Sequence, residues 1–316
     1  MMNDNNQLNI QIDEQIVKRK KLLLIMNPKA GIMLAPKYLS EIIQRFSDAG
    51  FLTQVLMTAG GGDARNFAAW YGADADLIVV SGGDGTLNGV IDGLMLAGLE
   101  TPIGYIPAGS TNDFANSIGL PSTIFDCVDT IINGSPVHLD IGDFNGRYFS
   151  YVASFGAFTS TSYSVPQNIK NILGHTAYVL GGIRDVLSIK SVHAKVTADK
   201  GTPNELIVEG DYVFGAVCNS KSVAGILKLD KLDVDMNDGL MEVLLVRMPK
   251  DPIALNDIVV NMLGGTLASN QIEFFSAKDI DVEIDPGTHW TLDGEYEEGR
   301  DVCNITTVRS AITLIK

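Results

Sequence analysis

Three glycines and one carboxylate follow an apolar run in the first third of the chain, and these residue types could bind a phosphate group. The run at residues 76–80 leads directly into Ser81-Gly82-Gly83-Asp84-Gly85-Thr86-Leu87-Asn88. Glycines in such a loop allow positive φ and let backbone N–H groups approach an anion closely. Asp84 would repel a bare phosphate, so its presence indicates a bound cation or a proton to be removed. The alternative is an ordinary strand-to-helix turn.

The elements that must position this loop alternate between short apolar runs and helical patterns. Strands are predicted at 22–26, 51–57, 76–80 and 102–106, and helices at 36–49, 63–71, 87–97 and 123–132. This alternation predicts a doubly wound, mostly parallel α/β sheet, whose ligands lie beyond the carboxyl ends of its strands. Glycine-bearing loops at 27–31, 58–62, 81–88 and 107–115 all fall at those ends. Their convergence favours a binding site over isolated turns.

From residue 137 onward, hairpin signals replace the long helices. Strands are predicted at 140–144, 148–154, 192–198, 205–219, 240–246, 280–284, 288–292 and 305–315, with helices at 169–187 and 253–263. Asn145-Gly146 stands between the first two of these strands and is the strongest short hairpin signal. The second part of the chain is therefore expected to be mainly antiparallel β.

Composition indicates a globular protein long enough for two domains, with 316 residues of which 46% are apolar. Its three cysteines are far apart and lack metal-ligand spacing, which fits a reducing compartment. The net charge of −15 argues against a nucleic-acid partner. No apolar run reaches the roughly 18 to 20 residues that a membrane helix needs. Residues 1–20 are expected to be disordered, and the protein to be cytoplasmic.

Four motifs, in their order along the chain, resemble those of the bacterial diacylglycerol kinase-like lipid kinases, which are related to sphingosine kinases. They are Asn27-Pro28-Lys29-Ala30-Gly31, the loop from Gly82 to Asn88, Pro107-Ala108-Gly109-Ser110-Thr111-Asn112-Asp113-Phe114-Ala115 and Leu292-Asp293-Gly294-Glu295. The second motif alone is shared with NAD kinases and phosphofructokinase-like enzymes, whereas the third and fourth together favour the lipid kinases. The resemblance implies an α/β nucleotide-binding domain at 21–136, with 305–316 as a candidate completion, and an antiparallel β-sandwich domain at 137–304.

The resemblance also implies ATP and Mg²⁺ as cofactors. The residues that it assigns to the nucleotide are Asn27, Pro28, Lys29, Gly31, Thr58, Gly82, Gly83, Asp84, Gly85, Thr86, Asn88, Ser110, Asn112 and Asp113. Backbone N–H groups would hold the phosphates, and the Thr58 and Ser110 hydroxyls would donate to the same nucleotide. Two residues depart from the family pattern, because Ala30 stands where serine is common and Asn116 where arginine is common.

Carboxylates are the candidate catalytic residues: Glu295, Asp84 and Asp293. Glu295 matches the family position of the proton acceptor, while Asp84 is either a competing base or a ligand of the ATP-bound magnesium. A different interpretation of Asp293-Gly294 is a simple hairpin turn followed by an exposed glutamate. Because an alcohol has a high pKa, the base would take the proton late in phosphoryl transfer.

A second acidic cluster contains Asp230, Asp233, Asp235 and Asp238, and its oxygen atoms suit a hard cation. The resemblance implies a structural magnesium site at Asp235, Asp238 and the Leu240 carbonyl. The alternative is a solvated acidic turn.

These features predict an ATP-dependent lipid kinase that phosphorylates the primary hydroxyl of diacylglycerol or a similar lipid. The alternatives are a soluble-metabolite kinase of the NAD-kinase type and a non-catalytic nucleotide- or lipid-binding regulator. The expected partners are ATP and a lipid at the membrane surface, without nucleic acid, and a homodimer is left open. Residues 163–186 are expected to touch the bilayer, with the protein peripheral at the inner membrane face.

Overall fold

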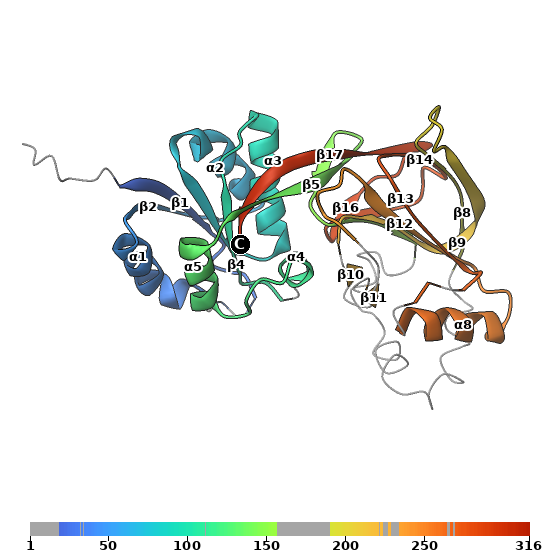
Figure 1. The fold of residues 1–316 in the computed structure, drawn as a ribbon, viewed down its shortest axis with the longest axis horizontal. Coiled ribbons are helices and arrows are strands. Elements are labelled where there is room, and N and C mark those ends of the chain that lie inside the picture. Colours follow the sequence, from blue (N-terminus) through green and yellow to red (C-terminus); the bar gives the residue numbers. More distant parts are fainter. Residues whose placement is uncertain are drawn as a thin grey trace, which may run out of the picture.

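The computed structural model describes residues 19–31, 33, 35–110, 112–156, 190–220, 222–223, 227–228, 234–263, 266–267 and 269–316. Figure 1 shows two lobes that are joined by two long strands, β5 (Pro136–Phe144) and β17 (Val302–Ile315). Three predictions lie wholly or mainly outside the described residues: the disordered start at 1–20, the helix at 169–187 and the membrane contact at 163–186.

The first lobe is built around a parallel sheet, as the sequence predicts. Its strands lie in the order β2, β1, β3, β4, with the bounds β1 Lys20–Met26, β2 Phe51–Met57, β3 Leu77–Gly82 and β4 Ile103–Pro107. The helices are α1 (Leu39–Asp48), α2 (Asp63–Tyr71), α3 (Asp84–Ala97), α4 (Asp113–Ser117) and α5 (Ile124–Asn133), with 3-10 turns η1 (Ala35–Tyr38) and η2 (Gly72–Asp74).

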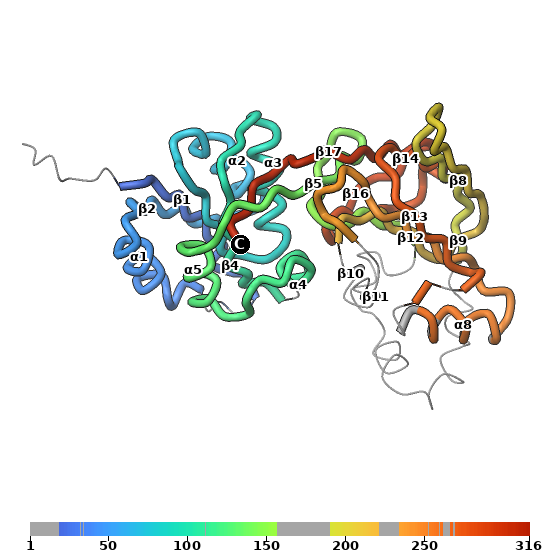
Figure 2. The backbone as a smooth tube through the Cα atoms, viewed as in Figure 1, coloured from blue at the N-terminus to red at the C-terminus, as the bar shows by residue number. Residues whose placement is uncertain are grey.

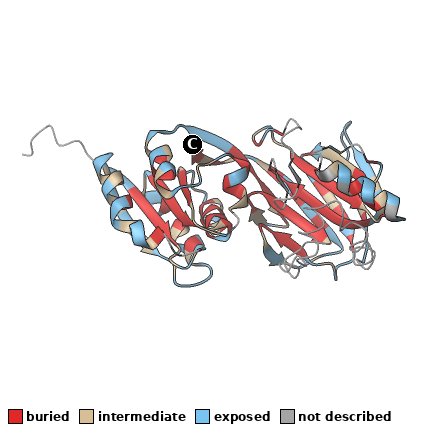
Figure 3. Ribbon diagram, turned by 90° about the horizontal axis from the view of Figure 1, so that it is seen from below, coloured by how far each residue is buried: buried red, intermediate tan, exposed pale blue. Residues whose placement is uncertain are grey.

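Alternate side chains of each strand enter different apolar clusters in this lobe. Leu23 and Ile25 of β1 lie in one cluster with residues of α2 and α3, while Leu22 and Leu24 lie in another with residues of α1 and α5. Because helices cover both faces, residues 22–26 of β1 are buried on both sides and are all apolar. Figure 3 shows this buried interior continuing into the second lobe.

The second lobe is antiparallel. Its strands are β6 (Arg147–Phe149), β7 (Val152–Gly156), β8 (Val192–Ala198), β9 (Leu206–Cys218), β10 (Ser222–Val223), β11 (Leu227–Lys228), β12 (Met241–Arg247), β13 (Ile272–Ala277), β14 (Asp279–Ile284), β15 (Trp290–Leu292) and β16 (Glu295–Glu297), with one described helix, α8 (Pro252–Leu263). Trp290 lies between Phe144 and Phe155, with ring centroids 4.9 and 4.8 Å away, in the apolar cluster of this lobe.

The predicted fold class, α/β followed by mainly antiparallel β, is confirmed. The structure adds that the described strands, apart from the β10–β11 pair, belong to one continuous 15-stranded hydrogen-bonded sheet. Four strands, β10, β11, β13 and β16, were not predicted. The predicted start of α3 at residue 87 was wrong, because the helix begins at Asp84, immediately after the glycines. Asp84 therefore belongs to a helix turn and not to the loop.

The last strand returns to the first lobe. β17 pairs antiparallel with β14 and β5, and its Leu314 pairs in parallel with Ile103 of β4. Figure 2 shows the end of the chain beside the first-lobe sheet. The end of β17 therefore adds a strand next to β4. Among the helices that the structure describes, none combines the length and the apolar character needed to cross a membrane.

Candidate active site

A cavity of about 940 Å³ lies at the carboxyl ends of the four parallel strands, and the second lobe supplies part of its wall. Its volume falls within the range of about 300–1,000 Å³ that is usual for small-molecule sites. Ten predicted site residues line it: Asn27, Lys29, Gly31, Thr58, Gly83, Gly85, Thr86, Asn88, Ser110 and Glu295. Five predicted nucleotide contacts belong to the same loops or to the turns that follow them, but are not among its described lining residues: Pro28, Gly82, Asp84, Asn112 and Asp113.

Glycine allows three of the cavity loops to approach each other closely. A Cβ placed on Gly109 would lie 2.6 Å from Gly83 Cα and 2.9 Å from Asn112 Oδ1. A Cβ placed on Gly31, whose φ is 50°, would lie 2.4 Å from the carbonyl oxygen of Ala108. Side chains at these positions would push the loops apart. The cavity wall here is formed by backbone, which is the arrangement that binds phosphate groups in glycine-rich loops.

We expect Gly109→Ala to lower the free energy of unfolding by about 1–3 kcal/mol, because the added methyl group would overlap the Gly83 backbone. Urea denaturation measures this loss. Gly61→Ala is the matched control, since Gly61 lines the same cavity and an added Cβ there would meet no atom within 4 Å. An equal loss in both variants would contradict this account of the loop contact.

Asp84 joins the glycine loop to the loop that follows β4. Its Oδ2 accepts a hydrogen bond from the Asp113 N–H at 3.0 Å, and its Oδ1 accepts one from the Phe114 N–H at 3.3 Å. A carboxylate in the first turn of α3 also interacts favourably with the helix dipole. Asp84 is buried, and its charge adds to the effect of burial in raising the pKa of Tyr105. The carboxylate therefore holds two cavity loops together.

Two further side chains shape the other loops of the first lobe. Asn27 accepts a hydrogen bond from the Lys29 N–H at 3.0 Å, and its Nδ2 donates to Thr86 Oγ1 at 3.3 Å. Asp63 Oδ2 accepts the N–H groups of residues 59 and 60 at 2.7 and 2.9 Å. These backbone hydrogen bonds lower the pKa of Asp63. Both loops are thus fixed by local contacts that leave them facing the cavity.

Arg147 and Glu295 meet on the second-lobe wall of the cavity. Each follows a hairpin turn in which both central residues have positive φ, 52° and 92° for Asn145-Gly146 and 50° and 85° for Asp293-Gly294, as in type I′ turns. Arg147 Nη2 donates to Glu295 Oε2 at 2.8 Å. Glu295 Oε1 lies 3.3 Å from the position that a Cβ on Gly85 would take, so its carboxylate reaches the first turn of α3. The two lobes thus place the glycine loop and a carboxylate side by side.

Comparison with known proteins identifies the family to which the chain belongs. The model of the diacylglycerol kinase catalytic domain matches residues 21–144. A diacylglycerol kinase of Bacillus subtilis is 32% identical over 279 residues, which cover 88% of this chain and 90% of the relative. The chain belongs to the diacylglycerol kinase family. A diacylglycerol kinase of Staphylococcus saprophyticus is 30% identical with the same coverage.

Solved structures support the membership of this kinase in the family. Two crystal structures from Bacillus anthracis str. Sterne superpose with TM-scores of 0.76 and 0.73 at 27% and 25% identity, and the second is a diacylglycerol kinase. They cover 96% and 95% of this chain, and each is itself covered to 97%. The predicted family and the prediction of a kinase are confirmed.

Asp293, a predicted catalytic candidate, lies in the interior of the kinase and not among the described lining residues of the cavity. Its Oδ2 accepts the N–H and the hydroxyl of Ser150 at 2.5 and 2.7 Å, and its Oδ1 accepts the N–H groups of Tyr151 and Val152, each at 3.0 Å. Burial raises the pKa of Asp293 to about 6, although these four hydrogen bonds act in the opposite direction. We interpret Asp293 as the residue that fixes the turn before Glu295.

Four charged or aromatic lining residues of the kinase were not predicted: Arg65, Asp92, Arg147 and Tyr148. Arg65 Nε lies 3.0 Å from Asp92 Oδ2 and joins α2 to α3, while burial raises the pKa of Asp92. Arg65 could have been predicted as a cavity residue, because it lies in the first turn of a helix that follows a glycine cluster. No local pattern distinguishes Arg147 or Tyr148, because both belong to a distant hairpin.

The predicted cation ligands of the kinase lie in a turn before β12. Asp235 Oδ1 accepts the Asn237 N–H at 3.1 Å, and Asp238 Oδ1 accepts the Leu240 N–H at 2.9 Å. Within the part of the chain that the structure describes, no group of three or more His, Cys, Asp or Glu residues could hold a metal ion. Asp230 and Asp233 lie outside that part.

Proposed function

We propose that the protein transfers the γ-phosphoryl group of ATP to the primary hydroxyl of diacylglycerol or a similar lipid. The observation that carries the proposal is the cavity in which backbone loops of the first lobe face Glu295 of the second. Phosphoryl transfer needs an anion-binding surface beside a group that accepts a proton, and these two walls supply both. Membership in the diacylglycerol kinase family supports a lipid as the acceptor.

The residues that line the cavity suit a nucleoside triphosphate such as ATP. Gly31, Gly83 and Gly109 line the cavity with backbone, because a Cβ at any of these positions would meet a neighbouring loop, and Lys29 brings a positive charge to the same cavity. The N-terminus of the 14-residue helix α3 adds the positive end of its dipole. The hydroxyls of Thr58 and Ser110 are the proposed side-chain donors to ATP.

We assign the role of base to Glu295 and a different role to Asp84. Glu295 is exposed to the cavity, so a lipid hydroxyl can reach its carboxylate and lose its proton there as phosphoryl transfer proceeds. Asp84 holds the loops in place, and it is also the candidate ligand of the Mg²⁺ that accompanies ATP. Bound Mg²⁺ would neutralise charge on the phosphates.

The direct test is an assay of the purified protein with γ-labelled ATP, Mg²⁺ and vesicles that contain diacylglycerol, sphingosine or no acceptor lipid, with NAD in a parallel reaction. We expect label in the lipid phase only with an acceptor lipid. Formation of NADP without any labelled lipid would favour the soluble-metabolite kinase. Binding of ATP without turnover of any acceptor would favour the non-catalytic regulator.

We further propose a cation site at Asp235, Asp238 and the Leu240 carbonyl. Glu242 supports this proposal, because it is buried and its Oε2 has no hydrogen-bond partner among the described residues. Burial raises the pKa of Glu242 to about 8, and the charges of Asp238 and Asp235 contribute in the same direction. A divalent cation held by Asp235, Asp238 and the Leu240 carbonyl would offset the repulsion between the two aspartates.

Magnesium should therefore stabilise the protein without ATP. Binding to the folded state alone contributes about 2.7 kcal/mol when the ion is present at 100 times its Kd. Thermal unfolding in MgCl₂ and in EDTA measures this difference as a shift in Tm. Asp238→Asn should remove most of the shift, because it keeps an oxygen that can accept the Leu240 N–H but loses the charge. The same magnesium-dependent shift in both proteins would refute the site.

We also propose that the enzyme meets its lipid at the inner membrane surface while remaining otherwise cytoplasmic. The family membership of the chain supports this, since diacylglycerol is held in bilayers. Flotation of the protein with vesicles that contain diacylglycerol, compared with vesicles that lack it, measures the association. No flotation with either kind of vesicle would contradict the proposal.

A further inference from the structure

Arg147 is a cavity residue that contacts three consecutive residues of β16. Its Nη1 donates to Glu297 Oε2 at 2.6 Å and to the Tyr296 carbonyl oxygen at 3.0 Å, while its Nη2 donates to Glu295 Oε2 at 2.8 Å. We propose that Arg147 is the positioning residue of the catalytic base: it holds Glu295 in the orientation that accepts the proton of the lipid hydroxyl. This inference rests on the proposed function of Glu295.

The guanidinium group is anchored independently of Glu295. Two of its three contacts are a backbone carbonyl and the carboxylate of Glu297, whose side chain is 20% exposed against 57% for that of Glu295. The planar fork of an arginine fixes the direction of every N–H group once two of them are bound. Arg147 is therefore a rigid donor, and an otherwise mobile, exposed glutamate is restricted by it.

The contact with Arg147 also distinguishes the two oxygens of Glu295. Oε2 accepts the hydrogen bond from Arg147, whereas Oε1 lies toward Gly85 at the first turn of α3. Because the glycine loop precedes that turn, Oε1 is the oxygen on the side of the proposed phosphate site. Arg147 thus keeps one oxygen occupied and directs the other toward the reacting groups. A lysine cannot reproduce this geometry, because its ammonium group is a compact charge and lacks the planar set of N–H donors of a guanidinium group.

The first test compares Arg147→Gln and Arg147→Lys with the wild type in the lipid kinase assay. We expect Arg147→Gln to lower kcat about 100-fold, since a misplacement of about 1 Å has an effect of that size. Arg147→Lys should recover only part of the loss, and KM for ATP should change little in either variant. A rise in KM for ATP with unchanged kcat would overturn the inference, because it would indicate that the guanidinium binds the nucleotide.

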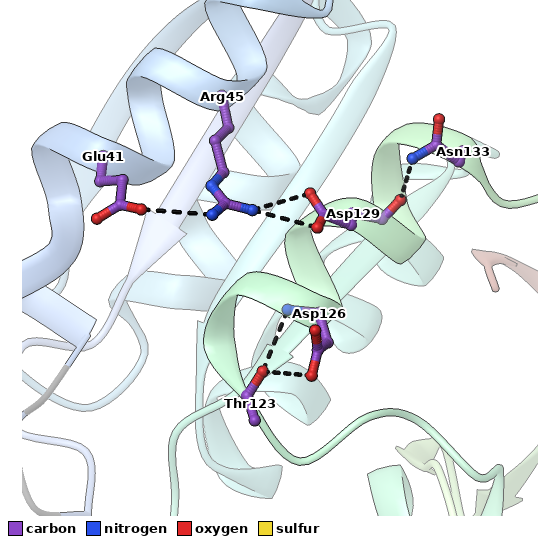
Figure 4. Close-up of polar contacts among 6 residues, drawn as sticks. All are labelled: Glu41, Arg45, Thr123, Asp126, Asp129 and Asn133. Carbon is purple, nitrogen blue, oxygen red and sulfur yellow. Dashed lines mark hydrogen bonds and ion pairs between the residues drawn. The ribbon is translucent and has the colours of Figure 1, made fainter.

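Arg45→Gln is the matched control. Figure 4 shows Arg45 between Asp129 and Glu41, with Nη1 at 3.0 Å from Asp129 Oδ1 and Nη2 at 3.4 Å from Glu41 Oε1. Its side chain is 34% exposed, as is that of Arg147, but it does not line the cavity. We expect unchanged kinase activity in this variant. A similar loss of kcat in both arginine variants would assign the effect to a general loss of ion pairs and overturn the inference.

A double variant tests whether Arg147 acts through Glu295. In the Glu295→Gln background, Arg147→Gln should cause no further loss of kcat, since there is no longer a base to position. A further loss as large as that in the wild type would show a direct effect on the phosphates and overturn the inference.

Crystal structures of the wild type and Arg147→Gln provide a readout that does not depend on turnover. We expect a single orientation of the Glu295 carboxylate in the wild type and several in the variant. The same single orientation in both would overturn the inference. If the wild type phosphorylates no lipid, the proposed function fails, while the two crystal structures still decide whether Arg147 positions Glu295.

Discussion

Glu295→Gln should lower kcat for lipid phosphorylation about 10²- to 10⁴-fold, the usual contribution of a general base. The amide has the same shape as the carboxylate, but it cannot take the proton of the acceptor hydroxyl. Glu295 does not belong to the glycine loops, so ATP binding should be retained. Steady-state kinetics with labelled ATP and diacylglycerol, together with calorimetric titration of ATP, separates the chemical step from nucleotide binding.

Glu298→Gln is the control for this substitution. Glu298 is an exposed residue three positions further along and does not line the cavity, so we expect wild-type kinetics. Asp84→Asn completes the comparison of the two candidate bases. If Asp84→Asn abolished turnover while Glu295→Gln remained near the wild-type rate, the base would be Asp84 and the proposed roles would be reversed.

The second large effect is expected at Asp293, where Asp293→Ala should lower the free energy of unfolding by at least about 3 kcal/mol. The substitution removes the carboxylate that accepts four hydrogen bonds. The buried N–H groups of residues 150–152 and the Ser150 hydroxyl would then lose this acceptor. Each buried donor left without an acceptor costs about 1–3 kcal/mol. Alanine also tolerates the left-handed φ of 50° less well than aspartate does. Urea denaturation followed by circular dichroism measures the change.

Two comparison variants distinguish the buried network from the turn itself. Asp293→Asn keeps a residue that accepts positive φ and one acceptor oxygen, so its loss of stability should be smaller than that of alanine. Asp285→Ala is the control, because Asp285 is exposed in its turn and its carboxylate accepts the Gly287 N–H at 2.7 Å. Similar small losses in Asp293→Ala and Asp285→Ala would mean that the buried contacts contribute little.

Kinase activity should fall together with stability in the Asp293 variants that remain folded. The carboxylate ties the β15–β16 turn to the segment at 150–152, and Glu295 is the residue immediately after that turn. We therefore propose that Asp293 supports the proposed base and does not contact the substrate.

Much of the fold was predictable because its determinants are local. The apolar run at 22–26 and the glycines that follow each parallel strand predicted both the sheet and the edge at which the cavity lies. Asn145-Gly146 predicted its hairpin for the same reason, since positive φ is a property of those two residues. The start of α3 was missed because glycines usually end helices, whereas here Gly83 is the residue before the first turn and Asp84 begins it.

The sequence by itself determined most of the strands, the turns and the four motifs of the candidate site, because each depends on residues that are neighbours in the chain. Only the tertiary structure decided which motif residues face the cavity and which support it. Asp293 and Glu295 are two positions apart, yet one is buried under the turn and the other is exposed. Arg147 and Glu295 are 148 positions apart and hydrogen-bonded. Their contact depends on two hairpins folding against each other, and long-range strand pairing leaves no local pattern in the sequence.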